Sequence, residues 1–85
     1  MIKYIIHVAY EDELYEQPSK ETEFNIMDED KNYFTDYKKA EKMWNKLVKQ
    51  NETFIQLNKL NTYYLMEFIR VTDRKIKILE RKKYI

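Results

Sequence analysis

Residues 2–10 read Ile2-Lys3-Tyr4-Ile5-Ile6-His7-Val8-Ala9-Tyr10, and every second residue builds a strongly apolar face. Apolar side chains at a period of two are typical of a β-strand that buries one face. We therefore expect a strand at the start of the chain, which Leu14 and Tyr15 could extend. After a polar stretch that holds Pro18, Phe24 and Ile26 alternate again, which predicts a second strand and a long hairpin.

A different period begins after a polar loop at residues 28–32. Apolar residues now recur at spacings of three and four, at Tyr37, Ala40, Met43, Trp44, Leu47 and Val48. Such spacing places one broad apolar stripe on an α-helix. We expect Thr35 to cap its N-terminus, with Asp36 favourably placed for the helix dipole. Because the chain has no Gly, we expect the helix to end near Gln50, with Asn51 in the capping conformation that Gly usually takes.

Turns that need a positive φ must use Asn or Asp in a chain without Gly, and the candidates are Asn51, Asn58, Asn61 and Asp73. Residues 53–60 and 62–71 are rich in large apolar side chains and predict two further strands. Residues 72–75 predict a tight turn, followed by a fifth strand from Lys75. The charged tail at residues 80–83 fits a strand or a helix equally well.

The predicted order is two strands, one helix and three strands. It indicates a single α+β domain over residues 1–85: a small antiparallel sheet of four to five strands, with one amphipathic helix packed on one face. Trp44 and Leu47 are expected to pack against Ile and Tyr side chains of the first and fourth strands. The basic tail, residues 80–85, is free to fray.

The composition argues against a catalytic, metal or cofactor site. The chain has no Cys and no Gly, which excludes disulfides, thiolate chemistry, the Walker loop and the dinucleotide fingerprint. His7 and Ser19 are the only residues of their kinds and form no recognisable catalytic pattern. A calcium loop starting at Asp28 would need Gly and Glu where Tyr33 and Lys39 stand. We predict no catalytic, metal-ligating or cofactor-binding residue, and a protein that is not an enzyme.

The apolar run at the N-terminus is too short to span a membrane and lacks a cleavage pattern, so we expect a cytoplasmic protein with no membrane partner. Thirteen Lys against three Arg, with nine Ile, eight Tyr and no Gly, indicate an AT-rich coding sequence. Such a bias in so short a chain suits a phage or another mobile element, in which case the location is the host cytoplasm. This origin is a hypothesis.

Charge is divided unevenly along the chain. Residues 1–36 carry ten acids and three bases, a net charge of −7, whereas residues 37–85 carry thirteen bases and five acids, a net charge of +8. The candidate acidic surface comprises Glu11, Asp12, Glu13, Glu16, Glu21, Glu23, Asp28, Glu29 and Asp30. The candidate basic surface is one face of the helix, formed by Lys38, Lys39, Lys42, Lys46 and Lys49. A second basic group lies in the last strands and the tail, at Arg70, Arg74, Lys75, Lys77, Arg81, Lys82 and Lys83.

Two arrangements of these charges remain open. The acidic hairpin can fold beside the basic helix or the basic tail, so that the fields partly cancel, or the two signs can occupy separate surfaces that steer charged partners. The second arrangement predicts a non-enzymatic protein-binding module. Its acidic surface would occlude a basic, nucleic-acid-binding surface of a host enzyme or defence complex, in the manner of an anti-CRISPR inhibitor. The alternatives are a nucleic-acid-binding protein that uses the basic helix face and the C-terminal strands, or a self-assembling structural protein, with a homodimer formed through an edge strand.

Overall fold

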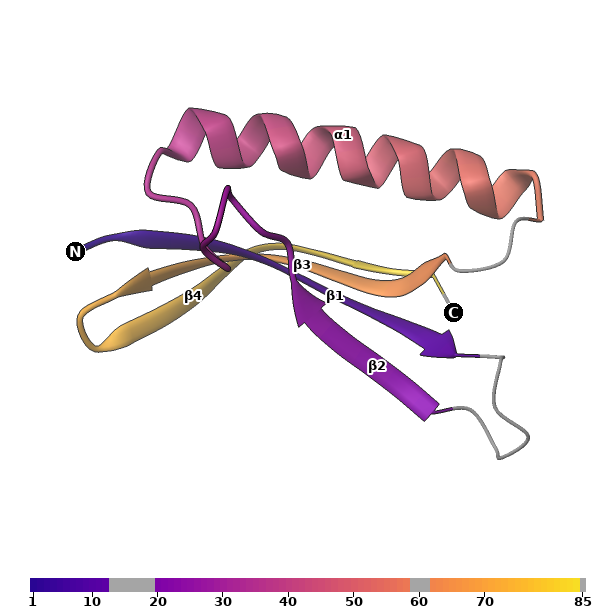
Figure 1. Ribbon diagram of the computed structural model, residues 1–85, viewed down its shortest axis with the longest axis horizontal. Coiled ribbons are helices and arrows are strands. Elements are labelled where there is room, and N and C mark those ends of the chain that lie inside the picture. Colours follow the sequence, from indigo (N-terminus) through magenta and orange to yellow (C-terminus); the bar gives the residue numbers. More distant parts are fainter. Residues whose placement is uncertain (13–19, 59–61, 85) are drawn as a thin grey trace.

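The computed structural model describes residues 1–12, 20–58 and 62–84, and of these the side chains of residues 11–12 and 20–22 are excepted. The elements are β1 (Lys3–Asp12), β2 (Lys20–Asn25), α1 (Tyr37–Gln56), β3 (Tyr63–Thr72) and β4 (Lys75–Lys83). The strands form an antiparallel sheet in the order β2-β1-β3-β4. The helix lies along one side of this sheet (Figure 1). This is the α+β fold, with a helix on one face, that the sequence predicts.

The two faces of the sheet follow from the strand register. On the helix side, Ile6 of β1 is opposite Phe68 of β3, and Val8 is opposite Met66. All four are buried, together with Phe34, Ala40 and Trp44. These residues form the core between α1 and the two central strands, and Trp44 stacks on Phe68 at a ring-centroid distance of 5.6 Å. Trp44 and Leu47 therefore pack toward β1 and β3, and β3 is the strand at residues 62–71 that was predicted as the fourth.

The start and the end of α1 differ from the sequence-based expectation. Asp36, and not Thr35, is the N-cap, since its Oδ1 accepts a hydrogen bond of 3.0 Å from the backbone N–H of Lys38. The helix continues past Gln50 to Gln56 and includes the start of the strand predicted at residues 53–60, so that prediction is wrong. Phe54 and Ile55 extend the apolar stripe at helical spacing, which explains why the helix does not stop.

Of the remaining predictions about turns and the C-terminal segment, some are confirmed and others are wrong. The turn at residues 72–75 is confirmed, and residues 80–83 belong to β4, which resolves the ambiguity of the tail. Asn58 has the expected positive φ of 52°, and Glu29, which was not predicted, has a φ of 59°. Asn51 lies inside α1 and Asp73 has no positive φ, so both of those predictions are wrong. Asn61 lies outside the described residues.

Candidate functional surfaces

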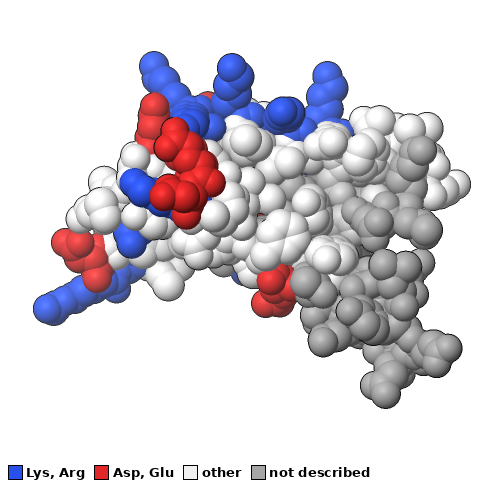
Figure 2. Space-filling view, in the orientation of Figure 1, with Lys and Arg blue, Asp and Glu red and all other residues white. Residues whose placement is uncertain are grey.

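A row of lysines runs along the outer side of α1. Lys38, Lys42, Lys46 and Lys49 are all exposed, and we call them the lysine ridge. With a rise of 1.5 Å per residue, the ridge is about 16 Å long. Figure 2 shows blue, basic side chains standing out along the helix, whose basic residues are all Lys. Within the described part of the chain, none of the four lysines is within ion-pair distance of an acid. Among the described residues, the ridge is therefore a cationic surface that no acidic side chain neutralises by an ion pair.

Lys39, the fifth predicted member of the basic surface, behaves differently. Its Nζ lies 2.6 Å from Oδ1 of Asp28. The hydrogen bond to Asp28 and the neighbouring acids raise the pKa of Lys39 above its usual value. A tight turn presents Asp28, because its backbone exchanges hydrogen bonds with that of Lys31. The acidic loop formed by Asp28, Glu29 and Asp30 thus meets the first turns of α1, where Figure 2 shows acidic side chains beside basic ones.

The acidic hairpin is described only in part. Glu23 of β2 is exposed, with Oε2 3.7 Å from Nε2 of His7. The backbones of Glu11, Asp12 and Glu21 belong to β1 and β2, but their side chains lie outside the described part, as do Glu13 and Glu16 entirely. The structure therefore brings Asp28 to the basic helix, keeps Glu23 on a different surface, and leaves the other hairpin acids as a prediction.

The second basic group follows β3 and β4. Arg81 donates to Oε2 of Glu67, from Nε at 2.9 Å and from Nη2 at 2.8 Å, so this arginine is paired. The nine residues of β4, which is an edge strand of the sheet, include five Lys or Arg residues. Cations on an edge strand oppose the addition of another strand.

The side of the sheet away from α1 was not singled out by the sequence reasoning. Cross-strand partners define one row as Ile5, Ile69 and Ile78, which we call the isoleucine row, and the next as Lys3, Val71 and Ile76. In Figure 1 none of the described segments lies along this side of the sheet. Ile76 is 75% exposed and Ile78 is 42% exposed. We call this surface the open face.

The open face also carries a polar half. Along β1 it continues from Ile5 to His7 and Ala9, opposite Glu67 and Leu65 of β3. Nδ1 of His7 lies 3.0 Å from Oδ1 of Asn25. The open face therefore consists of an apolar half at the start of β1, spanning β1, β3 and β4, and a polar half that reaches the edges of the sheet at Glu23 and at Arg81 and Lys83.

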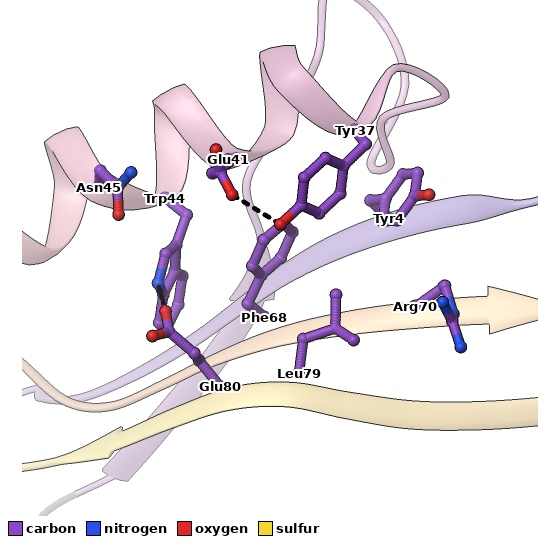
Figure 3. A pocket seen from close by; sticks show the side chains of 9 residues that line it. All are labelled: Tyr4, Tyr37, Glu41, Trp44, Asn45, Phe68, Arg70, Leu79 and Glu80. Atoms are coloured by element: carbon purple, nitrogen blue, oxygen red, sulfur yellow. Dashed lines mark hydrogen bonds between the residues drawn. The ribbon is translucent and has the colours of Figure 1, made fainter.

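A cleft of about 420 Å³ lies on the helix side, between the first half of α1 and strands β3 and β4. Its lining is Tyr4, Tyr37, Glu41, Trp44, Asn45, Phe68, Arg70, Leu79 and Glu80. The Tyr37 hydroxyl donates to Glu41 at 2.6 Å, and Nε1 of Trp44 donates to Glu80. Figure 3 shows both carboxylates directed toward these donors, with Arg70 at the far end of the cleft.

The cleft has the volume of a small-ligand pocket, but its lining offers an aromatic wall rather than a reactive group. Glu41 raises the pKa of the Tyr37 hydroxyl through their hydrogen bond, which holds that proton more firmly at neutral pH. His7 lies on the other side of the sheet. Within the part of the chain that is described, no three His, Cys, Asp or Glu residues gather as metal ligands do.

No described helix is long and apolar enough to cross a membrane. Comparison with protein-family models, with curated proteins and with solved structures finds no match to this chain. The surfaces themselves are therefore the basis for an inference about function. Of these, the open face was not predicted, because the alternation in the sequence was interpreted as one apolar face per strand. The signal was present: Ile5, Ile69 and Ile78 are apolar residues on strands whose other face is already apolar.

Proposed function

We propose that this protein is a non-enzymatic protein-binding module and that it binds through the open face of its sheet. One observation carries the proposal: three strands present an aliphatic surface that no described segment covers, and Ile76 at its edge is 75% exposed. Uncovered apolar patches with a polar border mark protein contacts, because burying them in an interface removes their surface from water. Aliphatic side chains offer little to a nucleic acid, whose recognition uses cations, hydrogen bonds and aromatic stacking.

The test compares the wild-type chain with a variant that carries Ile76→Lys and Ile78→Lys. Both substitutions replace exposed side chains and should leave the core intact. A tagged chain is produced in its native host together with an untagged copy, and the proteins that co-purify are identified with and without nuclease. We expect at least one protein that still co-purifies with the wild type after nuclease treatment and does not co-purify with the variant. Equal recovery by both chains would contradict the proposal.

A more specific form of the proposal is inhibition of a host enzyme or defence complex by occlusion of its basic surface. Among the described side chains of the candidate acidic surface, Glu23, Glu29 and Asp30 are exposed and available for such a contact. Asp28 is instead paired with Lys39. Reversal of the three exposed acids to Lys should abolish the capture of such a partner while thermal unfolding stays unchanged. Capture that survives the reversal would remove the acidic surface from the proposal.

Nucleic-acid binding is the second candidate, and the lysine ridge is the observation in its favour. Four exposed cations without an acidic partner in the described part lie along about 16 Å of helix and could follow a phosphate backbone. The ridge and the open face lie on opposite sides of the molecule. A protein that binds through one of them would therefore leave the other accessible.

A further inference from the structure

We infer that the partner of the open face is a second copy of this chain, so that two sheets pack face to face around a two-fold axis that runs parallel to the strands. This inference rests on the proposed function, because it identifies which protein the face binds. It also assigns a role to the edge residues Glu23 and Lys83, for which neither the core nor the lysine ridge accounts.

The apolar half of the face is complementary to itself under this symmetry. Rotation about an axis parallel to the strands preserves the position along each strand and exchanges the two edges of the sheet. The isoleucine row of one copy therefore meets the isoleucine row of the other, and the row of Lys3, Val71 and Ile76 meets its own equivalent. Two sheets that pack in this way bring their inner side chains together in a layer about 10 Å thick.

The charges at the two edges are also complementary. Glu23 of β2 and Lys83 of β4 end the same cross-strand row, which contains Ala9 and Leu65 between them. Three strand spacings separate them within one chain, a distance of about 14 Å, so they do not pair. Because the two-fold rotation exchanges the edges, Glu23 of one copy comes opposite Lys83 of the other, twice per dimer. A contact of this kind is isologous, and it closes at two copies.

Pairing through faces is favoured over pairing between two β4 edges. Five of the nine β4 residues are Lys or Arg, so two β4 edges placed side by side would bring like charges together. The irregular register between Phe68 and Ile69 further disturbs the β4 edge. In the face-to-face arrangement most of these cations stay at the rim or on the helix side, in contact with water.

The size of the open face is sufficient for a weak but specific dimer. The four strands, which are about nine residues long on average, give at their usual spacing a footprint of about 550 Å² per copy, or about 1,100 Å² for the pair. Specific interfaces begin at about 1,000 Å² of total buried area, and those near this limit are transient. We therefore expect association in the micromolar range, with a mass that depends on protein concentration.

Sedimentation velocity over a concentration series is the test, with the full chain throughout. The wild type should approach twice 10.7 kDa as the concentration rises. Ile78→Lys should stay at 10.7 kDa, because it places a cation in the isoleucine row. Leu57→Lys is the matched control, since Leu57 is 61% exposed at the end of α1 and the charge change is the same. This control should dimerise like the wild type, and far-ultraviolet circular dichroism verifies that all three chains are folded.

A wild-type chain that remains at 10.7 kDa at every concentration would overturn the inference, as would an Ile78→Lys chain that dimerises normally. The failure of the proposed function is distinguished by the capture experiment. A monomeric chain that captures a different protein through the open face would contradict self-pairing alone. If the chain is monomeric and captures the same proteins with and without Ile76→Lys and Ile78→Lys, both self-pairing and binding through the open face are contradicted.

Discussion

Asn51 of α1 is bound to the backbone of Tyr63 at both ends of its amide. Nδ2 donates to the Tyr63 carbonyl oxygen at 2.9 Å, and Oδ1 accepts from the Tyr63 N–H at 2.8 Å. The Asn51 side chain is 3% exposed, and Tyr63 is the first residue of β3. This pair therefore joins the second half of the helix to the start of a central strand, across a chain segment that includes residues 59–61.

Replacement of Asn51 by Leu should destabilise the protein. The substitution removes both hydrogen bonds and leaves the Tyr63 N–H and carbonyl without this partner, at an expected cost of about 2–4 kcal/mol. Urea unfolding followed by circular dichroism measures the change. Gln50→Leu is the control, because Gln50 is its exposed neighbour on the same helix, and it should change stability by less than about 0.5 kcal/mol. A similar stability for the two variants would contradict the role given to this pair.

Trp44 should be the largest single contributor to the core. It is 1% exposed, stacks on Phe68 and donates its indole N–H to Glu80. Trp44→Ala should cost about 3–5 kcal/mol of unfolding free energy, because it removes a buried ring from a small core. Trp44→Phe keeps an aromatic ring and loses the hydrogen bond, so it should cost clearly less. Thermal unfolding of Trp44→Ala that matches the wild type would show that the packing described between α1 and the sheet is wrong.

Stability should fall at alkaline pH. Burial raises the pKa of Tyr63 above its ordinary value of 10.0 and does the same for Tyr84. The unfolded chain then loses these phenolic protons first, so the stabilisation is complete below about pH 10 and decreases as the pH rises toward the folded-state pKa. Midpoint temperatures measured from about pH 8 to about pH 11 should decline, and less steeply for Tyr63→Phe. An identical decline in the variant would exclude Tyr63 as a source.

Charge reversal on the lysine ridge tests nucleic-acid binding. If the ridge contacts phosphates, wild-type chain should shift a short DNA duplex at low salt, and Lys42→Glu with Lys46→Glu should weaken the shift. The slope of log affinity against log salt should also decrease in magnitude by about two. The control is Lys75→Glu with Lys77→Glu, which changes the net charge equally at the β3–β4 turn and in β4. No shift by the wild type at low salt, or equal losses in both variants, would reject the ridge as the binding surface.

The class of fold could be predicted from the sequence, because strands and helices that bury one side show a clear spacing of apolar residues. Alternation in residues 2–10 and the apolar stripe of the helix identify β1 and most of α1, and both are confirmed. The boundary near Asn51 was wrong because a buried Asn resembles a capping residue in sequence. Only the position of Tyr63 in space shows that its amide has a tertiary partner.

The candidate sites were less accessible to sequence reasoning. Helical spacing places Lys38, Lys42, Lys46 and Lys49 on one exposed face, and the structure confirms that placement. That Lys39 is paired with Asp28 depends on how the preceding loop returns to the helix, which spacing alone does not determine. The open face depends on the register of three strands, since Ile5, Ile69 and Ile78 come from distant segments and align only in the sheet.

The most direct measurement of the central claim is a cross-linking experiment between two singly substituted chains. The protein has no Cys, so Glu23→Cys and Lys83→Cys each provide one thiol. The chains are mixed and treated with a short bis-maleimide reagent, and each is also treated alone or mixed with Leu57→Cys. The two-fold face-to-face arrangement predicts efficient cross-linking of Glu23→Cys to Lys83→Cys and much less in every other combination. Cross-linking of that pair at the level of the Leu57→Cys control would contradict the account.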